Sequence, residues 1–171
     1  MNWTQLLKDK VEYTYSIVDN LIAMTEGLPL DWKPSPENNW MTTGQLLMHI
    51  IHSCGAPMKG FVTGDWGIPN EADAAHIPPA EQLPSVNSAD EARRMLAEDK
   101  ATALRMIDQA GEDRLANEPA PAPWDPRPAP LGQRLLSMID HIESHKFQLF
   151  FFLKLQGKPV NTMHLWAPPA Q

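Results

Sequence analysis

Apolar residues recur every three or four positions in four stretches of the chain, which is the period of an α-helix with one buried face. The four stretches are 3–26, 43–62, 89–110 and 131–155. The last of them has neither proline nor glycine after Gly132. Its apolar stripe consists of Leu135, Ile139, Ile142, Leu149 and Leu153. The pattern therefore predicts four long helices.

Capping motifs support two of the predicted helix starts. Thr42-x-x-Gln45 and Ser88-x-x-Glu91 both match the capping box, in which two side chains satisfy amide groups at a helix start. Pro57 lies inside the helix predicted over 43–62. Because proline lacks an amide hydrogen and clashes with the preceding turn, we expect a kink near residues 53–56.

The connections between the predicted helices are long and rich in proline, and none has the alternating pattern of a strand. Four helices without strands indicate an all-α fold, and we expect a single four-helix-bundle domain over residues 1–171. Hairpin connections do not require loops as long as 63–87 or 112–130, so long crossover loops are expected. Trp32 and Trp40 are expected to pack their loop onto the bundle.

Composition excludes several classes of partner. The formal net charge is −7, and no more than two basic residues, Arg93 and Arg94, are adjacent, so nucleic acid is not an expected partner. No run of 18 apolar residues could span a membrane, and the first residues do not resemble a secretory signal. With one cysteine, Cys54, there is no internal disulfide. A cytoplasmic location is therefore expected.

Cys54 is a candidate nucleophile by residue type alone. It lies, however, on the apolar face of the helix predicted over 43–62, among Leu47, Ile50, Ile51 and Met58. A thiol in such surroundings is buried and inert, because burial disfavours the reactive thiolate. We therefore expect Cys54 to be a core residue.

Histidines give the clearest candidate chemistry. His141 and His145 are four residues apart on the helix predicted over 131–155, so their rings project from one side and can share a divalent metal. Two hydrogen-bonded, half-buried histidines are the alternative interpretation. His49 and His52 are three apart on the helix over 43–62, and only one of them is expected to join the pair.

Three neutral imidazoles from two facing helices, His49, His141 and His145, would leave a fourth coordination position for water or substrate, as in catalytic metal sites. Zn, Ni, Fe(II) and Mn all remain possible metals. Gln148 lies on the same side and is expected either to orient a ligand or a histidine nitrogen, or to be a solvated polar residue. Glu143 points away from the histidines and is expected to be solvated.

Three segments carry a resemblance to a known family. They are Trp32-Lys33-Pro34, Leu46-Leu47-Met48-His49-Ile50, and Asp140-His141-Ile-Glu-Ser-His145-Lys-Phe-Gln148 with the following Phe152 to Pro159. With four helices in the same order, the chain resembles the DinB-like (DinB/YfiT) metal-binding proteins over nearly its whole length. The resemblance implies that His49, His141 and His145 are metal ligands. Lys146 and Phe147 depart from the family pattern, which has Arg-Gly there.

The resemblance also implies a four-helix bundle that is commonly a homodimer, binds a divalent metal and acts on a small molecule. Some family members use a low-molecular-weight thiol such as bacillithiol or mycothiol, and we therefore expect a thiol-dependent S-transferase. A metal-dependent hydrolase, with His52 as the base for a bound water, is the alternative enzyme. A non-catalytic bundle that binds a metal or ligand, or simply dimerises, is the third possibility.

Overall fold

The computed structural model describes residues 2–67 and 78–167, and all regular elements within these ranges are helices. The long helices are α1 (Trp3–Ala23), α4 (Ala89–Asn117) and α5 (Leu131–Leu155). Two shorter helices, α2 (Thr43–Ile50) and α3 (Gly55–Thr63), follow α1. Two single turns are η2 (Ala80–Gln82) and α6 (Met163–Trp166). The prediction of an all-α fold is confirmed.

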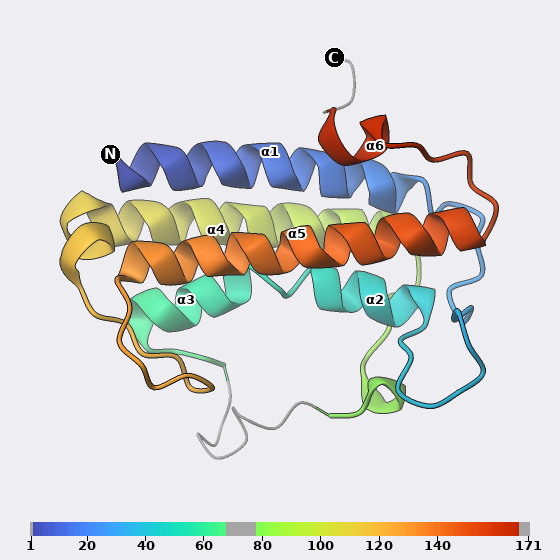
Figure 1. Ribbon diagram of the computed structural model, residues 1–171, viewed down its shortest axis with the longest axis horizontal. Helices are drawn as coiled ribbons and strands as arrows, with labels where there is room; N and C mark the ends of the chain where they lie inside the picture. Colours follow the sequence, from blue (N-terminus) through green and yellow to red (C-terminus); the bar gives the residue numbers. More distant parts are fainter. Residues whose placement is uncertain (1, 68–77, 168–171) are drawn as a thin grey trace.

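The helices form a bundle in which α2 and α3 lie end to end and take the place of one helix (Figure 1). The α1 and α5 helices run in one direction, whereas α2, α3 and α4 run in the other (Figure 1). Because α3 and α4 are parallel, the connection between them returns along the length of the bundle, as a crossover does. None of the described helices is long and apolar enough to cross a membrane.

The kink expected near Pro57 is a complete break between α2 and α3. The α2 helix ends at Ile50, and the backbone at Cys54 (φ −130°, ψ −67°) is not helical before α3 begins at Gly55. Pro57 therefore lies in the first turn of α3, where a missing amide hydrogen costs nothing. The start of α3 is held by Asp99 of α4, whose carboxylate accepts from the amides of Gly55 and Ala56 at 2.9 Å each.

Thr42 and Gln45 form the predicted capping box at the start of α2. Two helix ends, however, differ from the expectation. The α1 helix ends at Ala23 and not at residue 26. The α4 helix continues to Asn117 beyond Gly111, where the backbone turns through a positive φ of 68°. Glycine adopts this conformation without a steric penalty, so the chain bends at Gly111 and resumes its helix.

Apolar residues of the predicted stripes form one core, and Leu7, Val11, Ile139, Leu149 and Leu153 are all fully buried. In the loop between α1 and α2, Trp32 packs edge-on against Phe152 with ring centroids 5.4 Å apart. Trp40 remains 42% exposed. The loop is thus attached to the bundle through Trp32, whereas the expectation for Trp40 was wrong.

Glu143 is only partly solvated and is paired, whereas we expected a solvated side chain. Its carboxylate accepts from the Thr14 hydroxyl at 2.8 Å and pairs with the Lys146 ammonium at 2.7 Å. The Lys146 side chain is fully buried and also donates to the Leu165 carbonyl at 3.1 Å. A buried ammonium needs such partners, so Glu143 is the counter-ion of Lys146.

The C-terminal segment contains the short helix α6, and Lys146 and Phe147 hold it in place. The Lys146 ammonium lies over the rings of Phe147 and Trp166, at 5.2 and 4.9 Å from their centroids. The Tyr13 hydroxyl donates to the Trp166 carbonyl at 2.6 Å. The two residues that depart from the Arg-Gly of the family pattern therefore connect α6 to α5, and Tyr13 connects it to α1.

Candidate metal centre

Three histidine rings meet where the last turn of α2 faces the middle of α5. His49 comes from α2, while His141 and His145 come from successive turns of α5. The Nε2 atom of His145 lies 2.9 Å from Nε2 of His49 and 3.0 Å from Nε2 of His141. The three nitrogens therefore converge on one point between the two helices.

The second nitrogen of two of these rings is held by an acceptor. Nδ1 of His141 lies 3.1 Å from the Ser53 carbonyl oxygen, and Nδ1 of His145 lies 2.9 Å from Oε1 of Gln148. Because both partners accept, each Nδ1 carries the hydrogen and each Nε2 keeps its lone pair. This is the arrangement found around metal-binding histidines, whose other nitrogen donates to a carbonyl or carboxylate.

Burial keeps all three imidazoles neutral at physiological pH. It lowers the pKa of His49 to about 4, with a further contribution from the neighbouring His145, His141 and His52. Burial and the nearby His145 also lower the pKa of His141, and burial lowers that of His145. A lowered pKa favours the unprotonated ring, which is the form that binds a metal.

The donor set fits a divalent metal. Ligand nitrogens about 2.1 Å from a tetrahedral zinc lie roughly 3.4 Å apart, so small movements of the rings would admit the ion. Within the described parts of the chain, His49, His141 and His145 are the one group of three or more side chains that could hold a metal ion. Three half-buried imidazoles suit Zn, Ni or Fe better than Mg or Ca, which prefer oxygen ligands.

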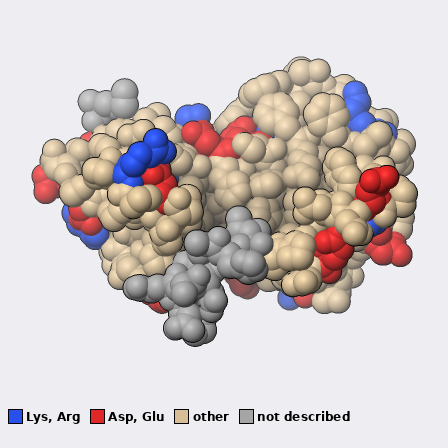
Figure 2. Space-filling model, turned by 60° about the horizontal axis from the view of Figure 1, so that its bottom comes forward, with Lys and Arg blue, Asp and Glu red and all other residues tan. Residues whose placement is uncertain are grey.

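A cavity of about 510 Å³ adjoins the histidines, and its lining contains His49 and His141 but not His145. The other polar lining residues are His52 and Ser53, and the apolar ones are Ala56, Pro57, Trp66, Trp124 and Met138. The face on the side of α2 and α3 is hollowed between two lobes, and the visible walls are mostly uncharged (Figure 2). A ligand in this cavity would contact the metal-binding candidates directly.

His52 belongs to the cavity and not to the histidine cluster. It is exposed and lines the cavity beside His49, whereas the cluster consists of His49, His141 and His145. The structure thus separates the two histidines of this segment by position, which the sequence left open. Gln148 contacts His145 and not the cavity.

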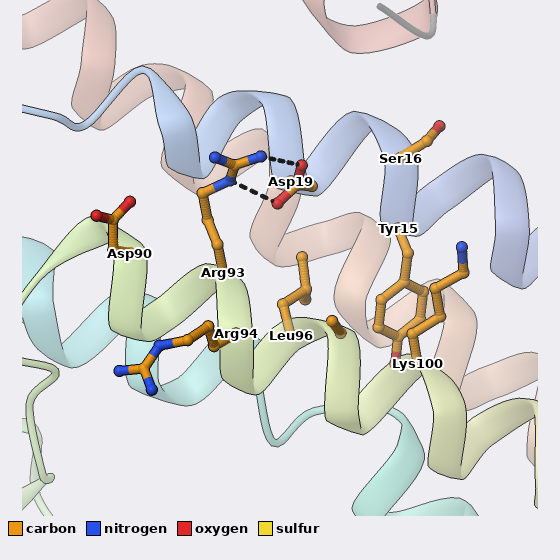
Figure 3. A pocket seen from close by; sticks show the side chains of 9 residues that line it. Tyr15, Ser16, Asp19, Asp90, Arg93, Arg94, Leu96 and Lys100 are labelled. Carbon is orange, nitrogen blue, oxygen red and sulfur yellow. Dashed lines mark hydrogen bonds and ion pairs between the residues drawn. The ribbon is translucent and has the colours of Figure 1, made fainter.

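A larger groove of about 660 Å³ lies between α1 and α4, away from the histidines (Figure 3). Three of its charged groups are partnered: Arg93 pairs with Asp19 through two contacts of 2.8 Å, and Lys100 pairs with Glu12. Tyr15 presents its ring there but turns its hydroxyl to Asp99 at 2.6 Å. Since no set of metal-binding side chains adjoins it among the described residues, we place the candidate site in the smaller cavity.

Two features of the site were missed from the sequence. One is the Ser53 carbonyl, which a continuous helix would have bonded to the amide of residue 57. Because residue 57 is proline, this carbonyl is free to hold His141. The other is the pair Trp66 and Trp124, which two separate connections bring to the same cavity. Pro57 could have indicated the free carbonyl from the sequence. The spacing of residues gives no signal for the pair of tryptophans.

Cys54 is fully buried beside Tyr15 and Asp99, and burial raises the pKa of its thiol. We expect Ellman's reagent to modify native Cys54 at least about 100-fold more slowly than a free thiol, because the reactive thiolate is disfavoured. The modification of Cys54 is followed by absorbance, first in the native protein after mixing and then after unfolding in guanidinium chloride. Ala56→Cys in a Cys54→Ala background, where the position is exposed, is the reactive control. Fast modification of the folded wild type would make Cys54 a candidate nucleophile again.

Comparison with known families gives one match. The family model described as the DinB superfamily matches residues 15–149, which is well over half of the chain and includes all three histidines of the cluster. No curated protein and no solved structure matches the chain.

Proposed function

The chain belongs to the DinB superfamily, and from this premise we propose that it is a metal-dependent S-transferase that joins a low-molecular-weight thiol to an electrophilic small molecule. The observation that carries the proposal is the position of the histidine cluster: His49 and His141 hold converging nitrogens and also line a cavity large enough for a substrate. An open site of this kind is typical of catalytic metal centres.

His49, His141 and His145 would hold the metal, which would be Zn, Ni, Fe or Mn. When bound, such a metal lowers the pKa of a coordinated thiol and so supplies a thiolate at neutral pH. Ser53 and Gln148 keep two of the rings in the orientation that this requires. In this proposal Gln148 acts on the ligand His145 and not on the substrate.

His52 would accept the proton of the thiol. It lies on the cavity wall and is exposed, so it can pass the proton on to water. In the reaction, the thiol sulfur forms a bond to the electrophilic carbon as the bond from that carbon to its leaving group breaks. The leaving group departs with the electron pair, and the proton reaches His52, so atoms and charges balance.

The test is thiol consumption by the purified, metal-loaded protein in the presence of an electrophile such as benzyl chloride, followed by mass spectrometry of the thioether. We expect thiol-dependent product, and His52→Ala should lower its rate by roughly 100-fold while keeping the metal, as loss of a proton-transfer group does. His164→Ala, which changes a histidine of α6 outside the site, is the matched control.

A metal-dependent hydrolase is the second candidate, favoured by the same position of His52, which could act as base for a water. Turnover of esters or amides without any thiol would support the hydrolase and overturn the transferase. Metal binding without either activity would leave a non-catalytic binding bundle. The homodimer and the small-molecule substrate implied by the family resemblance stay predictions.

A further inference from the structure

Trp124 is 53% exposed although the loop that carries it is firmly held. On either side of it, Ala122 and Asp125 exchange two backbone hydrogen bonds of 2.9 and 3.0 Å. Arg134 of α5 donates to the carbonyls of Ala120 and Asp125, at 2.9 and 3.3 Å. The indole is therefore kept at the surface by an ordered turn. A large exposed aromatic side chain in a fixed position is typical of a binding surface.

Trp66 provides a second, similarly fixed indole. It packs so closely on Gly60 that a Cβ atom there would lie 2.2 Å from Cε3 of Trp66. Its ring centroid is 4.9 Å from that of Phe61 and 5.6 Å from that of Trp124, both in edge-to-face geometry. Two indoles from different connections thus form one aromatic wall of the cavity, and they need little reorganisation to accept a ligand.

The described side chains around the cavity do not offer a counter-charge for a charged ligand. Among the described residues that line it, none is Lys, Arg, Asp or Glu. The Ser53 hydroxyl is already engaged, donating to the Ile50 carbonyl at 2.8 Å. The remaining polar side chains are imidazoles, two of which are candidate metal ligands. Apart from the metal that His49 and His141 would hold, no described side chain of the lining offers a cation, so an anionic group bound against the tryptophans would lose its hydration without gaining a cation there.

We propose that the substrate of this site carries a flat, uncharged aromatic group that stacks on Trp66 and Trp124, with its reacting carbon directed toward the histidine cluster. The orientation of the reacting carbon rests on the proposed function above. The preference for an uncharged aromatic ligand does not depend on turnover. The apolar part of the lining, with Met138 and Pro57, would enclose the rest of the ring.

Binding of two matched probes tests the preference. Methyl 2-naphthyl sulfone and 2-naphthalenesulfonate share one ring system and nearly one size, differ by one charge, and are both weak metal ligands. Titrated into the metal-loaded protein without thiol and followed by tryptophan fluorescence, the neutral sulfone should bind at least about tenfold more tightly. Equal or tighter binding of the sulfonate, or of 2-naphthyltrimethylammonium, would overturn the proposal.

Variants assign the binding to the aromatic wall. Trp124→Ala should weaken sulfone binding by roughly tenfold, and Trp124→Phe by less, because an aromatic face remains. Calorimetry is used for these variants because they remove a fluorophore. Trp40→Ala removes another exposed indole, 42% exposed and outside the cavity, and should leave the affinity unchanged. Unchanged sulfone affinity in Trp124→Ala would contradict the proposed position.

This proposal and the proposed reaction can fail separately. A protein that binds the sulfone through Trp124 but consumes no thiol would retain the aromatic site and lose the transferase. A protein that consumes thiol yet shows no preference for the neutral probe would retain the transferase and lose the aromatic substrate class.

Discussion

Replacing His145 with alanine is expected to lower metal content from near one equivalent per chain to less than about a tenth. Nε2 of His145 lies between those of His49 and His141, at 2.9 and 3.0 Å, so its loss leaves two nitrogens facing a gap. Loss of an outer hydrogen-bond partner alone costs about 10–100-fold in metal affinity, and we expect at least about 1,000-fold for a ligand. Elemental mass spectrometry of untagged protein measures the metal content.

The fold should survive this substitution, because alanine is the best helix former and position 145 lies well inside α5. Circular dichroism is expected to show wild-type helix content. Gln148→Ala keeps all three nitrogens and removes only the acceptor for Nδ1 of His145, so a loss of about 10–100-fold in metal affinity is expected. This graded variant separates the loss of a ligand from a general disturbance of α5.

His52→Ala is the control for the choice of ligand on the segment between α2 and α3. It should retain the metal, since His52 lies outside the cluster of His49, His141 and His145. Full metal content in His145→Ala would refute the three-histidine site. Metal loss in His52→Ala with retention in His49→Ala would transfer the ligand role from His49 to His52.

The helical period was sufficient to predict the fold, because each buried stripe is a local property of the sequence. The helix over 131–155 has the predicted bounds, since Pro130 and Gly157 border an unbroken apolar stripe. Features that depend on distant partners were not predictable in this way. The α6 turn, for example, is held to α5 by buried Lys146, which donates to the Leu165 carbonyl. Nothing in residues 160–171 alone indicates this contact.

In the candidate site, too, local features were predictable from the sequence, whereas features that depend on tertiary packing were not. Spacing four apart on one helix brings His141 and His145 together whatever the tertiary structure, and facing helices supply His49. The choice between His49 and His52 depended on the break after Ile50, whose extent Pro57 does not determine by itself. The aromatic wall depended on two proline-rich connections, and their conformations are set by packing and not by a period.

Asp99 is the buried group whose loss should destabilise the protein most. The residue is only 7% exposed, and its carboxylate accepts from the Tyr15 hydroxyl at 2.6 Å and from the amides of Gly55 and Ala56. Asp99→Ala leaves these three donors without a partner and opens a cavity between α1, α3 and α4. We expect the free energy of unfolding to fall by about 3–5 kcal/mol, measured by urea denaturation. The segment between α2 and α3, which contains Ser53, should become less ordered as well.

Graded variants identify the cause of that loss. Burial raises the pKa of the Asp99 carboxyl, so the fold disfavours its charge. Asp99→Asn keeps one acceptor oxygen but turns its NH2 group toward a donor, so it should cost less than alanine without restoring the stability of the wild type. Tyr15→Phe removes one donor and keeps the ring, at about 1–2 kcal/mol. Asp108→Ala, at an exposed position of α4, should change stability by less than about 1 kcal/mol.

If Asp99→Ala unfolds at the same urea concentration as Asp108→Ala, then the α3 start is held by helix packing and not by the Asp99 carboxylate. The position of the Ser53 carbonyl against His141 would then depend on the break itself.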